Sequence, residues 1–240
     1  MDLTDLPIVS TLLDLTCTGL MALTTLLAPA TGAFSAALAI VLVTLVVRTG
    51  LIPAGIAQAK AEQTRARLAP RLRDLQTRHR GNPERLQREI MALYRSEGAS
   101  PFAGCLPIFI QAPIVGLLYS VFLHGAIAGH ANDLLTQTLF DVPLGVSLVG
   151  AVALGTAEPV TWLVIGCLVL TVAAVGEVTR RLFRIAPVEG AVRVPTGLLG
   201  ALQFATAVVA LFVPLAAGLY LLTTVIWTLC QRLVLRRVYG

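Results

Sequence analysis

Long apolar runs with almost no charge are the feature that most constrains how this chain of 240 residues can fold. Residues 33–57, 101–123 and 159–178 each contain no more than one charged side chain. About 20 mostly apolar residues in a helix cross the hydrocarbon core of a bilayer. The uncharged stretch 194–231 is too long for one crossing at about 1.5 Å per residue, and Pro214 marks a place to turn between two shorter ones.

The sequence therefore predicts an all-α polytopic membrane protein with five transmembrane helices, at 33–57, 100–123, 159–178, 196–213 and 214–232. A β-barrel would show short segments of alternating hydrophobicity, whereas these runs are continuous. Charged residues make up only 13% of the chain, against roughly 25% in soluble domains. This composition excludes an ordinary soluble enzyme and a disordered chain. It also argues against DNA binding, despite the net charge of +5.

The distribution of basic residues predicts the orientation in the membrane. Outside the apolar runs, Lys and Arg occur in 58–99, in 179–195 and around the tail 233–240, whereas 1–32 and 124–158 carry acidic residues and no basic ones. Segments rich in Lys and Arg stay in the cytoplasm. We therefore expect the N-terminus outside and the C-terminus inside the cell.

The two outer segments are expected to contain membrane-surface elements rather than spans. Residues 1–32 lack a basic n-region, so we expect a helix lying on the outer surface and no cleaved signal peptide. The run 142–157 is shorter than a membrane-spanning helix requires, and Glu158-Pro159 follows it directly. A crossing there would also put the arginines of 179–195 outside, so we expect an interfacial or re-entrant segment.

The polar block 58–99 is predicted to form an antiparallel helical hairpin. Leucine and isoleucine recur at helical spacing on both sides of Gly81-Asn82-Pro83-Glu84, where Asn82 suits an N-cap and Pro83 the first helical position. Pro70 is expected to kink or interrupt the first helix. The block contains 10 basic and 5 acidic residues. It could be a solvated loop, or a docking surface for anionic lipid, ribosomal RNA or an emerging chain.

Arg48 is the one charge inside an apolar run, where it follows 15 apolar or small residues of the span 33–57. An arginine at the centre of a bilayer costs roughly 2.5–3.5 kcal/mol on insertion scales. The side chain could extend to the cytoplasmic headgroups. It could also face a water-filled pocket shared with the polar groups of Thr44, Gln111, Thr223 and Thr224. The residues leave both interpretations open.

No pattern typical of an enzyme or a cofactor site occurs in the sequence. It contains no HExxH, GxSxG or P-loop motif and no paired carboxylates within a span. The four cysteines, Cys17, Cys105, Cys167 and Cys230, are far apart in apolar surroundings and are expected to be small buried hydrophobes. We expect neither catalysis nor a cofactor.

Three stretches resemble one known family. They are VTLVVRTGLIP (43–53), EIMALYRSEGASPFAGCLPIFIQAPI (89–114) and FVPLAAGLYLLTTVIWTLCQRLVLRR (212–237). With the order of spans and loops, they resemble the YidC family of membrane protein insertases, in the short five-span form typical of Gram-positive and actinobacterial species. The resemblance covers about 33–237. In some members a second Tyr stands where this chain has Leu221.

The resemblance implies a five-helix bundle with an intramembrane hydrophilic groove that opens to the cytoplasm and to lipid. Arg48, Thr44, Gln111, Tyr220 and Thr224 are the groove residues that we expect to contact a client.

The implied function is to move nascent transmembrane segments from the cytoplasm into the bilayer of the bacterial cell membrane, without nucleotide hydrolysis. The expected partners are nascent membrane proteins, the ribosome, the Sec translocon and anionic phospholipids. A solute transporter or channel is the main alternative, although no repeat between halves supports it. A membrane-embedded enzyme and a purely structural assembly factor are further alternatives.

Overall fold

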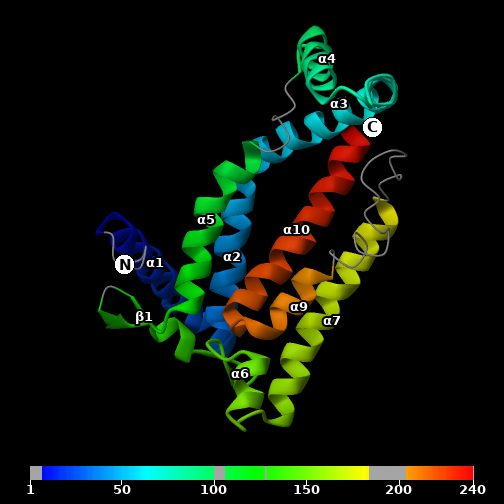
Figure 1. Ribbon diagram of the computed structural model, residues 1–240. Helices are drawn as coiled ribbons and strands as arrows, with labels where there is room; N and C mark the ends of the chain where they lie inside the picture. Colours follow the sequence, from blue (N-terminus) through cyan, green and yellow to red (C-terminus); the bar gives the residue numbers. More distant parts are fainter. Residues whose placement is uncertain (1–6, 100–105, 128, 184–203, 240) are drawn as a thin grey trace.

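The computed structural model describes residues 7–99, 106–127, 129–183 and 204–239, and the chain is mainly helical (Figure 1). Within these residues, three stretches are long and apolar enough to cross a membrane: Val9–Gly50, Pro159–Leu182 and Leu215–Val238. A helical protein with several membrane-length apolar segments is therefore confirmed. The expected count of five spans and their orientation stay predictions.

The N-terminal part is a pair of helices joined by a short 3-10 turn. Helix α1 (Pro7–Thr31), the turn η2 (Gly32–Phe34) and helix α2 (Ser35–Gly50) follow one another, and α1 packs against α2 and α5. Gly32 has φ +55°, a left-handed conformation that glycine adopts without strain. Buried Leu20 is part of the apolar core that α1 helps to form.

Two helices follow that form the hairpin. Helix α3 (Ile52–Arg78) is separated from α2 by the single residue Leu51, so part of the run 33–57 belongs to α3. It continues through Pro70, so the helix is not interrupted there, and the expected kink stays a prediction. A proline removes one main-chain hydrogen bond, and α3 tolerates that loss at Pro70. Helix α4 (Pro83–Ser96) completes the hairpin.

Helix α5 (Leu106–Leu123) leads into a compact region of short elements. In chain order these are β1 (Ala126–Ile127), β2 (His130–Ala131), η3 (Asp133–Thr136), β3 (Thr138–Leu139), β4 (Val142–Pro143) and α6 (Leu148–Ala153). The strands form two antiparallel pairs, β1 with β2 and β3 with β4. Within 142–157 the helix α6 is far shorter than a membrane crossing, in agreement with the exclusion of a span there.

Three helices complete the bundle: α7 (Pro159–Leu182), α9 (Ala205–Phe212) and α10 (Leu215–Tyr239). Helix α10 packs along both α2 and α7. The start of α10 carries alanines, and the fully buried Ala216 and Ala217 let neighbouring helices approach closely. The predicted fourth helix, 196–213, lies partly outside the described residues.

The two ends of the molecule differ in character. The hairpin of α3 and α4 lies at the same end as the C-terminus, and α6 with the short strands lies at the opposite end (Figure 1). The apolar core joins α1, α2, α5, α7, α9 and α10 near this second end. Its largest fully buried members are Phe122, Leu20, Ile40, Leu134, Leu144, Ile165 and Leu215.

Candidate functional site: a polar face on α10 beside α2

One face of α10 changes from apolar to polar along its length. Tyr220, Thr224, Trp227 and Gln231 follow one another at steps of four, three and four residues, which places them on the same side of a helix. Tyr220 is only 3% exposed, and its ring lies beside that of Phe122 with 6.3 Å between centroids. Tyr220 therefore belongs to the apolar core, and the polar atoms of this face begin one turn beyond it.

Two buried polar atoms on this face have no hydrogen-bond partner within the described part of the protein. They are the hydroxyl oxygen of Thr224 and the amide nitrogen Nε2 of Gln231. The neighbouring threonines, by contrast, both have hydrogen-bond partners. Thr223 Oγ1 donates to the carbonyl of Leu219 at 2.8 Å, and Thr228 Oγ1 donates to the carbonyl of Thr224 at 2.8 Å. A buried polar group left unpaired costs about 1–3 kcal/mol. Among the residues that the structure describes, Thr224 and Gln231 thus each present a polar atom that can bond water or a bound chain.

The facing helix α2 carries the other predicted groove residues. Thr44 is 2% exposed, and its hydroxyl donates to the carbonyl of Ile40 at 2.7 Å. Arg48 stands one turn later in the last turn of α2 and is half-buried. The partial negative charge at a helix C-terminus favours a cation there. Thr44, Arg48, Tyr220 and Thr224 thus lie on two helices that pack against each other.

Two residues change the predicted picture of this site. Gln111 lies within α5, but its side chain is outside the described set, so its place in a groove stays a prediction. Gln231 was missed because it stands near the end of the predicted span, where a polar side chain is ordinarily interfacial. The spacing of seven residues from Thr224 was the signal that could have placed it on the same face.

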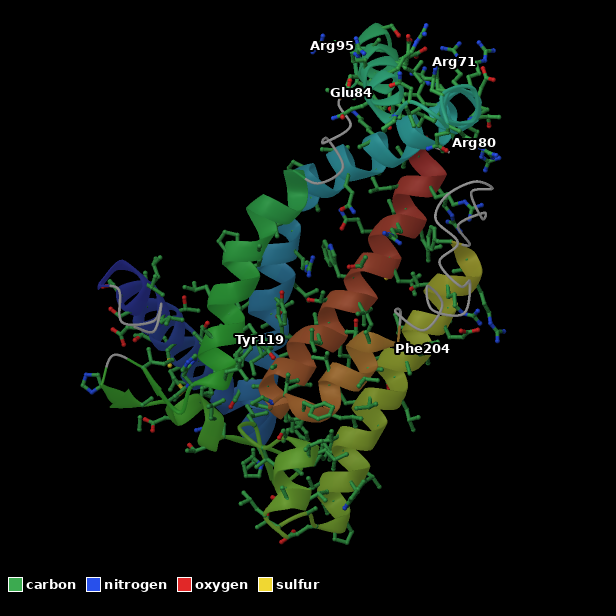
Figure 2. All side chains as sticks on the ribbon, in the orientation of Figure 1. Arg71, Arg80, Glu84, Arg95, Tyr119 and Phe204 are labelled. Atoms are coloured by element: carbon green, nitrogen blue, oxygen red, sulfur yellow. The ribbon has the colours of Figure 1, made fainter. Side chains whose placement is uncertain are left out.

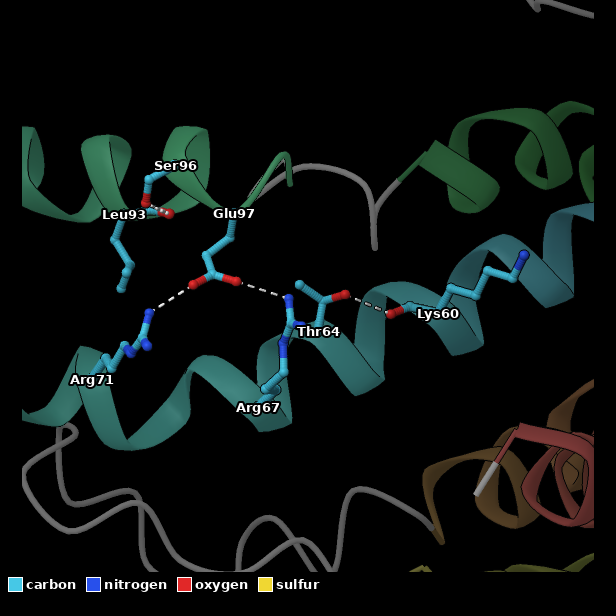
Figure 3. A network of polar contacts seen from close by, with 7 residues as sticks. All are labelled: Lys60, Thr64, Arg67, Arg71, Leu93, Ser96 and Glu97. Atoms are coloured by element: carbon cyan, nitrogen blue, oxygen red, sulfur yellow. Dashed lines mark hydrogen bonds and ion pairs between the residues drawn. The ribbon is translucent and has the colours of Figure 1, made fainter.

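Ion pairs join the two helices of the hairpin, α3 and α4. Glu97, the residue after α4, accepts from Arg67 Nη2 at 2.9 Å and from Arg71 Nη1 at 2.6 Å, both on α3 (Figure 3). Leu68 and Tyr94 are buried at 1% and 7% exposure. The two helices therefore share a small apolar contact as well as a bridging carboxylate.

The turn of the hairpin is formed as its sequence predicts. The Asn82 side chain accepts from the main-chain nitrogen of Arg85 at 2.9 Å, and Pro83 is the first helical residue of α4. Both the predicted cap and the predicted helix start are confirmed.

Exposed arginines cover the hairpin at the end of the molecule shown uppermost in Figure 2. Five of them are exposed and have no carboxylate within ion-pair distance among the described residues: Arg73, Arg80, Arg85, Arg88 and Arg95. Their charge is available to an anionic surface.

A second set of basic contacts holds the ends of α7 and α10 together. Arg236 donates to the carbonyl of Leu182 at 3.0 Å, and the guanidinium groups of Arg232 and Arg236 stand 5.7 and 6.0 Å from the centre of the Phe183 ring. Such cation–π contacts stabilise the approach of the two helices. Glu177 forms ion pairs with Arg180 and Arg181 within the same helix, α7.

A shallow apolar hollow on α7 does not compete with the polar face as a site. It has a volume of about 550 Å³ and is lined by Trp162, Leu163, Gly166, Cys167, Leu170, Thr171 and Ala174. The Thr171 hydroxyl in it is already bonded to the carbonyl of Cys167 at 2.7 Å. The hollow has the character of a lipid-facing surface.

Comparisons with known proteins agree with this architecture. The family described as "60Kd inner membrane protein" matches residues 26–240. The chain is 42% identical over 83 residues to the protein named membrane protein insertase YidC of Clostridium perfringens, covering 35% of each chain. It is 39% identical over 83 residues to the YidC of Helicobacter pylori strain 26695, covering 35% of this chain and 15% of the relative.

A third relative is similar over a part of the chain of comparable length. The YidC of Aquifex aeolicus is 37% identical over 86 residues, which cover 36% of this chain and 17% of the relative. The alignments with these relatives thus span from about a sixth to about a third of their lengths. Because the family match covers most of the chain, this protein belongs to the 60Kd inner membrane protein family, the YidC family, and is a bacterial inner-membrane protein.

Proposed function

We propose that this protein is a membrane protein insertase, which moves transmembrane segments of nascent membrane proteins from the cytoplasm into the lipid bilayer. The observation that carries the proposal is the buried Thr224 hydroxyl, which has no hydrogen-bond partner among the described residues, on a helix packed along the one that carries Arg48. The names of the relatives support the same activity.

The proposed topology has five spans, with the N-terminus outside and the C-terminus in the cytoplasm. The segments 58–99, 179–195 and 233–240 are then cytoplasmic, and 1–32 and 124–158 are outside. The position of the hairpin and the C-terminus at one end supports this arrangement, because both carry the excess of arginine (Figure 1).

In the proposed mechanism, the polar face lowers the barrier to moving a polar segment into the membrane. Burying an unpaired main-chain or side-chain polar group in hydrocarbon is costly. Arg48, Thr224 and water beside them offer hydrogen bonds that bulk solvent otherwise supplies. The apolar part of the client then moves sideways into lipid, driven by roughly 25 cal/mol for each Å² of apolar surface that leaves water. No covalent intermediate and no nucleotide enter this scheme.

Arg48 gives the face a preference among clients. A guanidinium group is a permanent cation with five donors and pairs strongly with a carboxylate. Client segments that carry Asp or Glu across the membrane should therefore depend on Arg48 most.

The hairpin is the proposed contact for partners on the cytoplasmic side. The five exposed arginines that have no carboxylate partner among the described side chains fit anionic surfaces, namely phospholipid headgroups and the RNA of a ribosome that delivers the client. The Sec translocon is a further proposed partner.

Arg48→Ala tests the proposal. In cells depleted of their own insertase, the variant should accumulate to normal levels but should fail to insert clients with acidic outer segments, as measured by protease protection of the client. Thr49→Ala is the matched control, because Thr49 is exposed on α2 and its hydroxyl already bonds the carbonyl of Leu45 at 2.8 Å. Full insertion by Arg48→Ala would contradict the groove assignment.

A further inference from the structure

Gln231 on α10 is seated directly on the backbone of α3. A β-carbon at Gly55 would overlap the Gln231 amide nitrogen Nε2, so only glycine leaves room for the carboxamide at this point. Most other glycines in the described helices show open space where a β-carbon would stand, including Gly50 at the end of α2. The close approach at Gly55 is therefore a specific feature of this contact between α3 and α10.

Trp227 fixes which way the Gln231 carboxamide points. The indole Nε1 of Trp227 donates to Gln231 Oε1 at 3.1 Å. An indole N–H can only donate, so the oxygen of the carboxamide must face Trp227 and the nitrogen must face Gly55. The carboxamide is thus oriented from one side by Trp227 and received on the other by Gly55.

The contact lies at the base of the hairpin. Gly55 stands one turn into α3, and only Leu51 separates α3 from α2. Helix α3 extends from the end of α2 toward the C-terminal part of α10 (Figure 1). The next residue, Arg232, stacks on Phe183 at the end of α7. The base of the hairpin therefore contacts α10, and α10 in turn contacts the end of α7.

We propose that Gln231 is a positioning residue that holds the base of the hairpin on α10, with Gly55 as its seat and Trp227 as its orienting partner. The buried Nε2 is left without a hydrogen bond in the seated state, and leaving the seat would let water satisfy it. The seat can therefore release at low cost when a client enters. Only this consequence for insertion rests on the proposed function.

Distance measurements test the seat itself. Spin labels at Arg73→Cys on α3 and Val178→Cys on α7, both exposed, report the hairpin direction in a chain whose native cysteines are alanine. Gly55→Ala displaces the flexible end of Gln231 rather than any backbone, so the variant should fold. We expect a broader distance distribution in Gly55→Ala and in Gln231→Leu than in the parent, and an unchanged one in the control Gly50→Ala.

The double variant separates a direct contact from two independent effects. Once Gln231→Leu has removed the carboxamide, Gly55→Ala should add no further broadening, because residues in contact give non-additive effects. In a Trp162→Phe background, the indole N–H resonance of Trp227 should also shift in both single variants. Parent-like distributions in both single variants, or additive broadening in the double variant, would overturn the seat.

Insertion assays on the same variants test the role of the seat in function. Reduced client insertion that parallels the broadening supports that role. Broadening with undiminished insertion would uphold the seat and overturn its part in insertion. A failed Arg48→Ala test would instead count against the proposed function and leave the distance result standing.

Discussion

The hairpin and the polar face of α10 differ in whether their polar side chains have partners within the described chain. In the hairpin, Glu97 is met by two arginines, and Asp74 pairs with Arg78 at 2.8 Å within α3. On α10, the Thr224 hydroxyl and the Gln231 amide nitrogen are buried, and neither has a hydrogen-bond partner among residues 7–99, 106–127, 129–183 and 204–239. Two hairpin carboxylates are thus paired within the hairpin, whereas the two atoms on α10 have no hydrogen-bond partner in the part of the chain that the structure describes.

The difference follows from the surroundings. An exposed ion pair contributes about 0–1 kcal/mol, because water competes for both charges. A buried polar atom without a partner costs about 1–3 kcal/mol. The hairpin therefore depends for its stability on its small apolar contact, and the membrane part keeps two costly atoms on one face of one helix. Two such atoms on one face are typical of a site where water or a ligand supplies the missing hydrogen bonds.

Leu68→Ala should give the largest effect and should stay confined to the hairpin. Leu68 is 1% exposed, and shortening a buried leucine to alanine costs about 2–5 kcal/mol. Hydrogen exchange of the amides in α3 and α4 should become faster, while exchange in α7 should not change. Leu72→Ala, at a half-buried position, should have a smaller effect. Equal acceleration in α7 would show that the two regions are not separate.

Glu97→Gln should loosen the hairpin by a smaller amount. The change removes two partly exposed ion pairs between the hairpin helices, worth together about 1 kcal/mol. Hydrogen exchange of α4 should become faster at low salt, and the difference from the parent should shrink at high salt because ions screen exposed charges. Asp74→Asn is the control, since its ion pair lies within α3. An equal effect of Asp74→Asn would contradict the role of Glu97 in joining the helices.

Thr224→Val should give the smallest change in stability and a measurable loss of insertion. If the Thr224 site were dry, removing an unpaired hydroxyl would stabilise the protein by about 1–3 kcal/mol. Because we infer that water reaches the hydroxyl, we expect almost no shift in thermal unfolding. Thr223→Val, which loses only a bond to the carbonyl of Leu219, should insert clients normally. A clear gain in thermal stability for Thr224→Val would indicate a dry site.

The sequence predicts the hairpin well because its signals are local. Asn82 and Pro83 act on residues within one turn of themselves, and the structure shows the expected cap and helix start. The interruption expected at Pro70 does not occur, and no local pattern indicated that α3 would continue through a proline.

The polar face is harder to predict because it depends on contacts between distant residues. Spacing alone could not separate Thr223, whose hydroxyl is bonded within its own helix, from Thr224, whose hydroxyl is not. Tyr220 has the aromatic ring expected of a client contact but lies in the apolar core. The seat of Gln231 on Gly55 joins residues on two helices far apart in the chain, and no local pattern predicts it.

Accessibility of position 224 to water tests the central claim most directly. In a chain with its native cysteines replaced, Thr224→Cys is treated in inside-out vesicles with a membrane-impermeant maleimide, which reacts with a thiolate and therefore requires water at the sulfur. Val46→Cys, at a position 72% exposed on the apolar helix α2, serves as the control in contact with lipid. We predict that Thr224→Cys is labelled from the cytoplasmic side and Val46→Cys is not. Equal lack of labelling at both positions would contradict a hydrated polar face beside Arg48.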